Sequence, residues 1–230
     1  MQQQNSLLWS LLSFVGCTGL FWFLTGSPIF AVAFMSMIMI HELGHYFAAK
    51  HIGVDVTLPM FTPLGAFVEF KSFPANAAQE AYIAMGGPFV GSIAAFAAMF
   101  VSAKLGMPEL GMAAKFGLWL NLFNLIPWSP LDGGRISQVL SRHLWVLGII
   151  LLGLAALTLQ LSLMNIIIMV MILASGWKDV QFRSQLAQEQ PEFFQVGTGL
   201  RIAYGGLYLA LSGALFYAVY NFGAVLKMMI

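Results

Sequence analysis

The chain has 230 residues, of which 60% are hydrophobic and only 8% are charged. A soluble globular domain carries about 25% charged residues, so this composition excludes an ordinary water-soluble protein and predicts residence in a lipid bilayer. The 10 Lys and Arg residues against 9 Asp and Glu give a formal net charge of +1, which provides no excess of positive charge for binding a nucleic acid.

Long apolar runs predict membrane-spanning helices. A helix that crosses a hydrocarbon core about 30 Å thick needs about 20 mostly apolar residues, because it rises about 1.5 Å per residue. The first run follows an uncharged N-terminus and precedes no clear cleavage site, so we expect a retained span and not a removed signal peptide. The predicted spans with this length are 6–26, 28–50, 77–103, 110–127 and 200–225.

The apolar stretch 144–177 is 34 residues long, which is too long for one crossing. We expect it to form two short spans that separate near Gln160–Ser162, which makes seven spans. Lys and Arg gather on the cytoplasmic side of membrane proteins, and their distribution favours this count. With the N-terminus inside, seven of them fall inside and three outside, whereas a single helix over 144–177 would give five against five.

Two stretches differ from the spans. Residues 53–72 mix prolines, glycine and β-forming residues, and the alternation over 66–70 predicts a small β-ribbon at the cytoplasmic interface. Residues 179–199 are rich in charge and glutamine, which indicates a cytoplasmic connecting helix broken at Pro191. The predicted fold is therefore an all-α membrane protein, a polytopic bundle of about six to seven transmembrane helices with one β-ribbon. Its divisions are a first span at 1–27, a core at 28–178, the connecting segment 179–199 and an additional C-terminal span at 200–230.

The second predicted span carries His41, Glu42 and His45 in the sequence HELGH. Residues four apart share one face of an α-helix, so both imidazoles can reach one tetrahedral Zn²⁺. Glu42 lies one step round the helix, where its carboxylate can take a proton from a metal-activated water. Charged groups at the centre of a membrane helix cost about 2.5–3.5 kcal/mol each, and a bound metal offsets that cost. The pattern therefore indicates a metallopeptidase centre.

A catalytic zinc site needs a third protein ligand and one open position. Asp132 is the candidate, because it follows the fourth predicted span in NLIPWSPLDGGR, at the same predicted cytoplasmic level as His45. The surrounding prolines and glycines break the helix, and irregular backbone at membrane depth is tolerated only where protein or a watery cavity surrounds it. The other two histidines, His51 and His143, lie at predicted span ends and are expected to be interfacial.

With HELGH on an early span and NLIPWSPLDGG on a later one, the chain resembles the site-2 protease family of intramembrane zinc metallopeptidases over about residues 28–178. The resemblance implies that His41, His45 and Asp132 bind one Zn²⁺ per chain and that Glu42 is the catalytic base. It also implies that Asn124 lies near the reacting carbonyl or the bound substrate. Helix packing alone would also explain an Asn in a span, so both roles for Asn124 stay open.

Two further segments are similar to segments of that family. Gly86, Gly87 and Pro88 match a Gly-Gly-Pro segment, and together with Gly91 they offer a small-residue surface that close helix packing explains. The β-ribbon resembles a membrane-associated β-segment of the family, which implies that an extended substrate pairs with it. The residues expected to contact substrate there are Gly65, Ala66 and Phe67.

The implied function is hydrolysis of a peptide bond within or next to the transmembrane segment of a single-span membrane protein, in regulated intramembrane proteolysis. The distribution of Lys and Arg places the active site toward the cytoplasm, and the compact chain suggests a prokaryotic plasma membrane. Two alternatives remain. A metal-binding or metal-transport protein could use the same ligands, although it would have little use for the non-ligating Glu42. A membrane metallopeptidase of the prenyl-protein-processing kind would take its third ligand from a glutamate on a later helix.

Overall fold

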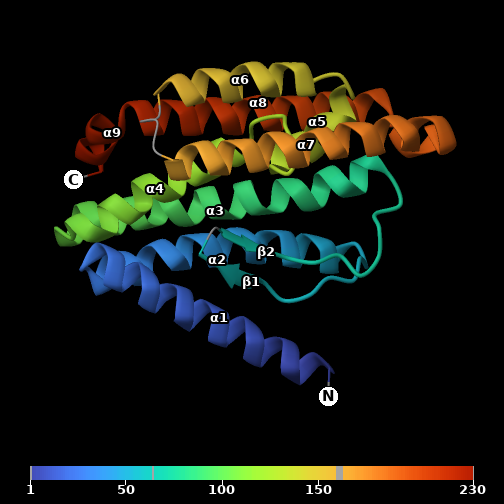
Figure 1. Ribbon diagram of the computed structural model, residues 1–230. Helices are drawn as coiled ribbons and strands as arrows, with labels where there is room; N and C mark the ends of the chain where they lie inside the picture. Colours follow the sequence, from blue (N-terminus) through green and yellow to red (C-terminus); the bar gives the residue numbers. More distant parts are fainter. Residues whose placement is uncertain (1, 64, 159–162, 230) are drawn as a thin grey trace. The chain divides into compact units, whose positions relative to one another are not determined.

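The computed structural model of the protein describes residues 2–63, 65–158 and 163–229 (Figure 1). Within these ranges the chain is mostly helical, with one two-stranded antiparallel sheet, as predicted. The elements in chain order are α1 (Gln2–Thr25), α2 (Pro28–His51), β1 (Met60–Thr62), β2 (Gly65–Phe67), α3 (Ala77–Leu105), α4 (Pro108–Asn124), α5 (Asp132–Leu140), α6 (Trp145–Thr158), α7 (Leu163–Glu189), the 3₁₀ turn η1 (Pro191–Phe194), α8 (Thr198–Tyr220) and α9 (Phe222–Met228).

The helices follow the predicted apolar runs. The stretch 144–177 forms two helices, α6 and α7, as expected, and the predicted separation at Gln160–Ser162 lies outside the described residues. Helix α7 continues through the polar residues to Glu189 and ends just before Pro191, where the break was predicted. Two features were not predicted: the short helix α5, which begins at Asp132, and the division of the last run at Asn221 into α8 and α9.

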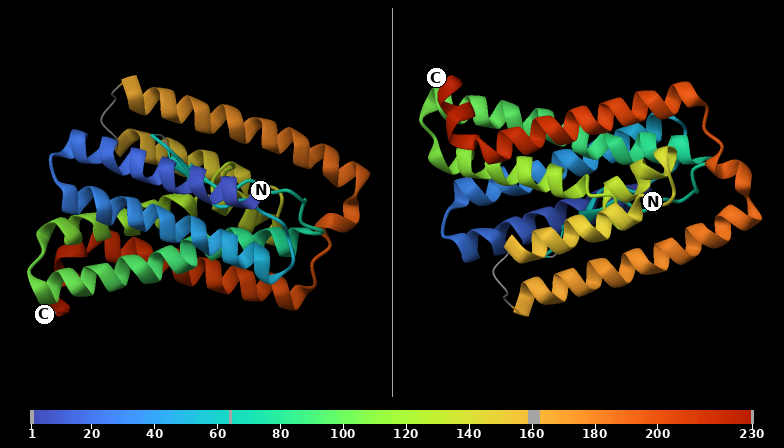
Figure 2. Two further views of the ribbon diagram at one scale, coloured as in Figure 1. Left: turned by 90° about the horizontal axis from the view of Figure 1, so that it is seen from below. Right: turned by 90° about the horizontal axis from the view of Figure 1, so that it is seen from above.

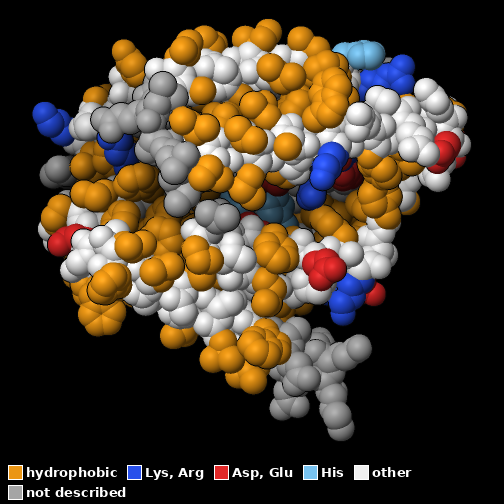
Figure 3. Space-filling model, in the orientation of Figure 1, with side chains coloured by type: hydrophobic (Ala, Val, Ile, Leu, Met, Phe, Trp, Pro, Cys, Tyr) orange, Lys and Arg blue, Asp and Glu red, His pale blue; other side chains and the backbone are white. Residues whose placement is uncertain are grey.

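Four helices of the described part are long and apolar enough to cross a membrane, whereas α4 and α6 are shorter, with 17 and 14 residues. The total of six to seven spans therefore stays a prediction. Only 11% of the apolar window is buried in each of α1 and α8, against 44% in α2 and 56% in α3. Apolar side chains are correspondingly prominent on the surface seen in Figure 3. The four spans are Leu7–Thr25, Pro28–His51, Ala77–Leu105 and Thr198–Tyr220.

The described chain forms two compact units. The first comprises Met1–Phe73, Gly86–Leu122 and Leu211–Ile230, and the second comprises Pro74–Met85 and Phe123–Ala210. Helices α3, α4 and α8 each pass from one unit into the other. The first unit therefore carries the HELGH sequence and the β-ribbon, and the second carries the loop before Asp132.

In the first unit, α1 and α2 lie side by side and are joined by a tight turn (Figure 2). Gly26 makes the turn possible with a φ of 70°, which other residues rarely adopt. Ser27 then caps α2, since its side-chain oxygen accepts a hydrogen bond from the backbone nitrogen of Phe30 at 3.2 Å, and Pro28 occupies the first turn. These local signals determine where the helix that carries the histidines begins.

The β-ribbon pairs Met60 with Phe67 and Thr62 with Gly65. Helix α1 holds β1 in place, because Ser10 donates a hydrogen bond to the carbonyl oxygen of Pro59 at 2.5 Å and Ser13 accepts one from the nitrogen of Phe61 at 3.2 Å. The alternation predicted over 66–70 is only partly strand, since β2 ends at Phe67. An isolated bridge between Val56 and Phe70 extends the pairing.

In the second unit, the core lies under the loop between α4 and α5. Trp128, Leu131 and Leu152 are buried together, and Trp145 and Ile172 pack against them. The Trp128 indole nitrogen donates a hydrogen bond to the carbonyl oxygen of Ile172 at 3.0 Å. Side chains of α6 and α7 therefore form the floor on which this loop rests.

Candidate metal centre

The two histidines of HELGH lie in the last turns of α2, where both are buried. Their Nε2 atoms face each other at 3.2 Å. Two imidazole nitrogens bound to one tetrahedral Zn²⁺ at about 2.0–2.1 Å from the metal are about 3.3–3.4 Å apart. The separation of the two Nε2 atoms therefore matches that of two ligands of one zinc ion, and the two imidazoles are donors of the type that zinc prefers.

Asn121 of α4 sets the orientation of the first imidazole. The Nδ1 atom of His41 donates to Oδ1 of Asn121 at 2.8 Å, and Nδ2 of Asn121 donates to the carbonyl oxygen of Gly117 at 2.7 Å. The second bond assigns the amide, so its oxygen is the atom that faces the ring. Nδ1 of His41 therefore carries the proton, and Nε2 presents the lone pair that a metal requires.

Glycines let α2 and α3 approach at the level of the histidines. A Cβ at Gly44 would lie 2.3 Å from the carbonyl oxygen of Gly86, and a Cβ at Gly87 would lie 2.2 Å from Nε2 of His45. A Cβ at Gly91 would lie 2.4 Å from Oδ1 of Asn121. The close packing expected of this small-residue surface is observed, and it also makes room for the histidine and asparagine side chains.

Glu42 follows His41 in α2 and is 8% exposed. His41 and His45 are four residues apart and share one face of the helix. Glu42 is adjacent to His41 in sequence, so it projects beside that face and not from it. A carboxylate in this position is suited to moving a proton, whereas the two imidazoles are suited to coordination. The assignment of Glu42 as catalytic base stays a prediction.

Asp132 is the first residue of α5, in the second unit, and is 7% exposed. A helix N-terminus stabilises a negative charge, which favours a carboxylate at this position. The two residues after Asp132 are glycines because no side chain fits there. A Cβ at Gly133 would lie 2.2 Å from the carbonyl oxygen of Leu125, and a Cβ at Gly134 would lie 2.4 Å from the backbone nitrogen of Ser129. The sequence DGG therefore lets the loop fold back onto the start of α5.

The other predicted site residues are distributed over both units. Asn124 is the last residue of α4 and is half-buried in the second unit, while Gly65, Ala66 and Phe67 form β2 in the first. Because the histidines and Asp132 belong to different units, the three-residue ligand set stays a prediction, as does the substrate contact of Asn124 and β2.

Asn121 was missed by sequence reasoning. A signal for it existed, because a polar side chain inside a predicted span must find a partner. Two asparagines, Asn121 and Asn124, lie three residues apart in that span, and only the second belongs to the motif that carried the family resemblance. Which of them faces His41 depends on how α4 packs against α2.

Comparisons with known proteins agree with this reading. The model of peptidase family M50 matches residues 29–108, which include HELGH and the β-ribbon. A zinc metalloprotease of Methanocaldococcus jannaschii is 32% identical over 126 residues, which are 53% of this chain and 35% of that protein. The Rip3 protein of Mycobacterium tuberculosis is also 32% identical over 126 residues, which are 50% of this chain and 30% of that protein.

The chain thus spans about a third of the length of these curated relatives. Among solved structures, a site-2 protease from Methanocaldococcus jannaschii aligns with a TM-score of 0.48 and 25% identity, covering 75% of this chain and 88% of that one. The family match, together with the four apolar helices, identifies an integral, multi-pass membrane protein.

Proposed function

We propose that the chain is a membrane zinc endopeptidase of peptidase family M50, because the model of that family matches residues 29–108 and the similar curated proteins are zinc metalloproteases. Its reaction is hydrolysis of a peptide bond within or next to the transmembrane segment of a single-span membrane protein. The observation that carries this proposal is the facing pair of Nε2 atoms of His41 and His45 at 3.2 Å, with the tautomer of His41 set by Asn121. Such a pair is a ready donor set for one zinc ion.

In the proposed centre, His41, His45 and Asp132 hold one Zn²⁺ per chain. When bound, zinc supplies a Lewis acid that polarises the substrate carbonyl and lowers the pKa of a water to about 7. Two neutral imidazoles and one carboxylate are a common donor set for catalytic zinc, and they leave one position open. Asn121 keeps His41 in the tautomer that coordination needs.

Glu42 moves the proton in this proposal. Its carboxylate takes a proton from the attacking water as the new C–O bond forms, and delivers it to the amide nitrogen as the C–N bond breaks. The products are a carboxylic acid and an amine, so no further reactant is needed. Burial of Glu42 limits competing exchange of that proton with bulk water.

The β-ribbon is the proposed place for the substrate chain. Over the described residues β2 pairs with β1 alone, so its other edge can accept an added strand. A helical substrate hides its scissile amide in intrahelical hydrogen bonds and must unwind first, and strand addition stabilises the unwound form. We place this reaction at the cytoplasmic side of a prokaryotic plasma membrane, as part of regulated intramembrane proteolysis.

The test compares cells that express the wild-type chain, Glu42→Gln or the surface control Glu192→Gln. Membrane protein fragments released into the soluble fraction are identified by mass spectrometry, and zinc per purified chain is measured by plasma emission. Glu42→Gln should keep one zinc per chain and lower fragment release by about 10²-fold or more. Undiminished release by Glu42→Gln would exclude the assigned base.

Asp132→Ala is the companion variant for the ligand set. It should lower bound zinc well below one per chain under the same purification. Full retention of zinc would exclude Asp132 as a ligand and favour a different third ligand, such as the glutamate of the prenyl-processing alternative.

A further inference from the structure

A buried ion-pair network in the second unit joins three separate segments. Arg183 of α7 donates to both carboxylate oxygens of Glu80, from Nη2 at 2.7 Å and from Nη1 at 2.9 Å. Its Nε donates to Oδ2 of Asp179 at 2.6 Å, and the same oxygen accepts a hydrogen bond from the hydroxyl of Ser129 at 2.6 Å. The network therefore ends on the loop that leads to Asp132.

Burying this network costs desolvation free energy, so the packing of the second unit alone does not explain why charged residues are present here. Arg183 and Glu80 are both almost fully buried, and burial disfavours a charged guanidinium. Burial works to lower the pKa of Arg183, yet the hydrogen bonds and charge of Glu80, with those of Asp179, raise it overall. Apolar side chains of similar volume often stabilise a protein as well as a buried ion pair does, so packing alone does not call for these charges.

One face of α7 contacts the loop between α4 and α5. Ile172 accepts the indole hydrogen bond of Trp128, and a Cβ at Gly176 would lie 2.3 Å from the carbonyl oxygen of Ser129. Asp179 then accepts the hydroxyl of Ser129. Positions 172, 176 and 179 are spaced by four and three residues, so they share a single helical face, and Arg183 continues it by another turn.

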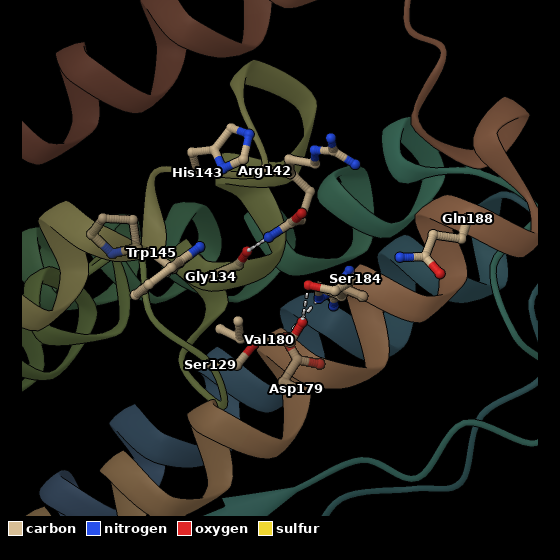
Figure 4. Close-up of a pocket in the computed structure, with 12 residues that line it drawn as sticks. Ser129, Gly134, Arg142, His143, Trp145, Asp179, Val180, Ser184 and Gln188 are labelled. Carbon is tan, nitrogen blue, oxygen red and sulfur yellow. Dashed lines mark hydrogen bonds and ion pairs between the residues drawn. The ribbon is translucent and has the colours of Figure 1, made fainter.

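On its other side the loop borders a cavity and not a packed core. A hollow of about 290 Å³ is lined in part by Ser129, Gly134, Gln138, Asp179 and Arg183 (Figure 4). A loop that borders a cavity makes fewer van der Waals contacts there than it would against a packed core. The hydrogen bond from Ser129 to Asp179 is one described contact that restrains the loop beside this cavity.

Short-range hydrogen bonds transmit this restraint to the start of α5. The backbone nitrogen of Leu131 donates to the carbonyl oxygen of Trp128 at 3.0 Å. The backbone nitrogen of Gly134 donates to the carbonyl oxygen of Leu131, also at 3.0 Å. These two bonds bracket Asp132. A displacement of Ser129 would consequently turn the first residue of the helix, and a ligand must lie within about 0.5 Å and 10–20° of its productive geometry.

We propose that Asp179 is a positioning residue for the metal centre, acting through Ser129 on the direction of Asp132, with Arg183 and Glu80 holding Asp179 in turn. This inference rests on the proposed function, in which Asp132 is a zinc ligand. Asp179 touches neither metal nor substrate, so its effect is on the affinity and geometry of metal binding and not on a proton transfer.

The sharpest test removes only the hydroxyl link. Ser129→Ala deletes the bond to Asp179 and leaves the ion pairs among Asp179, Arg183 and Glu80 in place. The matched control is Ser184→Ala, because Ser184 lines the same cavity but donates to the carbonyl oxygen of Val180 in its own helix at 2.8 Å. Ser129→Thr keeps the hydroxyl and serves as the conservative rescue.

Two readouts on purified full-length chain report on the metal centre without catalysis. Zinc affinity is measured by competition with a chromophoric chelator, and the visible absorption of the Co²⁺-loaded protein reports coordination geometry. Ser129→Ala should weaken zinc affinity about tenfold, toward the low end for residues that support metal ligands, and should alter the Co²⁺ spectrum. Ser129→Thr should restore both properties, and Ser184→Ala should leave both at wild-type values.

A double-mutant cycle completes the test. Asp179→Asn combined with Ser129→Ala should weaken zinc binding by less than the product of the two single effects, since both changes act through one bond. Wild-type affinity and spectrum in Ser129→Ala, or an equal loss in Ser184→Ala, would overturn the positioning role while the ligand set stands. Full zinc retention by Asp132→Ala would overturn the ligand set itself, and this inference with it.

Discussion

Asn121 receives the Nδ1 hydrogen of His41 at 2.8 Å while its own amide nitrogen is bound to the carbonyl oxygen of Gly117 at 2.7 Å. The asparagine therefore has no freedom to present its NH₂ group to the ring. Because both polar atoms of the Asn121 amide are hydrogen-bonded, Asn121 favours the tautomer of His41 that carries its hydrogen on Nδ1. The lone pair of His41 is then on Nε2, the atom that faces His45.

Replacing Asn121 should weaken the metal centre. Asn121→Leu removes the acceptor and leaves the Nδ1 hydrogen buried without it, so we expect zinc affinity to fall about 10–100-fold in a chelator competition assay. Asn121→Asp keeps an acceptor at the same place and should keep most of the affinity. Equal affinities for the wild type and Asn121→Leu would contradict a role in coordination.

The contact between α3 and the second histidine predicts a steric effect. Gly87→Ala places a Cβ 2.2 Å from Nε2 of His45, so the ring must move or the helices must separate. We expect at least a tenfold loss of zinc affinity, together with about 1–3 kcal/mol lower free energy of unfolding. Gly19→Ala in α1 is the control, because nothing lies within 4 Å of its added Cβ. A Gly87→Ala protein with wild-type zinc binding would show that His45 tolerates displacement.

The floor beneath the loop predicts a stability effect in the second unit. Gly176→Ala places a Cβ 2.1 Å from the indole ring of Trp128 and 2.3 Å from the carbonyl oxygen of Ser129. Overpacking of this kind should lower the free energy of unfolding by about 1–3 kcal/mol, measured by denaturant titration in detergent micelles. Gly153→Ala in α6 has open space around its Cβ and should be neutral or more stable by up to about 1 kcal/mol.

Zinc itself should stabilise the folded chain. A ligand that binds only the native state adds about 2.7 kcal/mol at a concentration of 100 times its Kd, so removing zinc with a chelator should lower the unfolding midpoint and adding zinc back should restore it. In His45→Ala, which lacks one of the two facing Nε2 atoms, this zinc response should be largely lost. An undiminished response in that variant would place the stabilising metal elsewhere.

Much of the architecture could be predicted because it is written in local pattern. Apolar runs of membrane length produced α1 to α4 and α8, and the mixture of prolines and β-formers after Gly53 predicted the ribbon. The spacing of His41 and His45 was sufficient to place two imidazoles on one helical face, since that depends only on the pitch of the helix.

Tertiary structure alone decided which groups meet across elements. Asn121 and Asn124 are both polar residues in one predicted span. Only the packing of α4 against α2 puts Asn121 beside His41. The partners Ser129 and Asp179 are 50 residues apart, and no periodicity relates them. Local pattern therefore determined the helices and the chemistry available on each face, whereas long-range packing selected the partners, because such contacts depend on how faces distant in sequence come together.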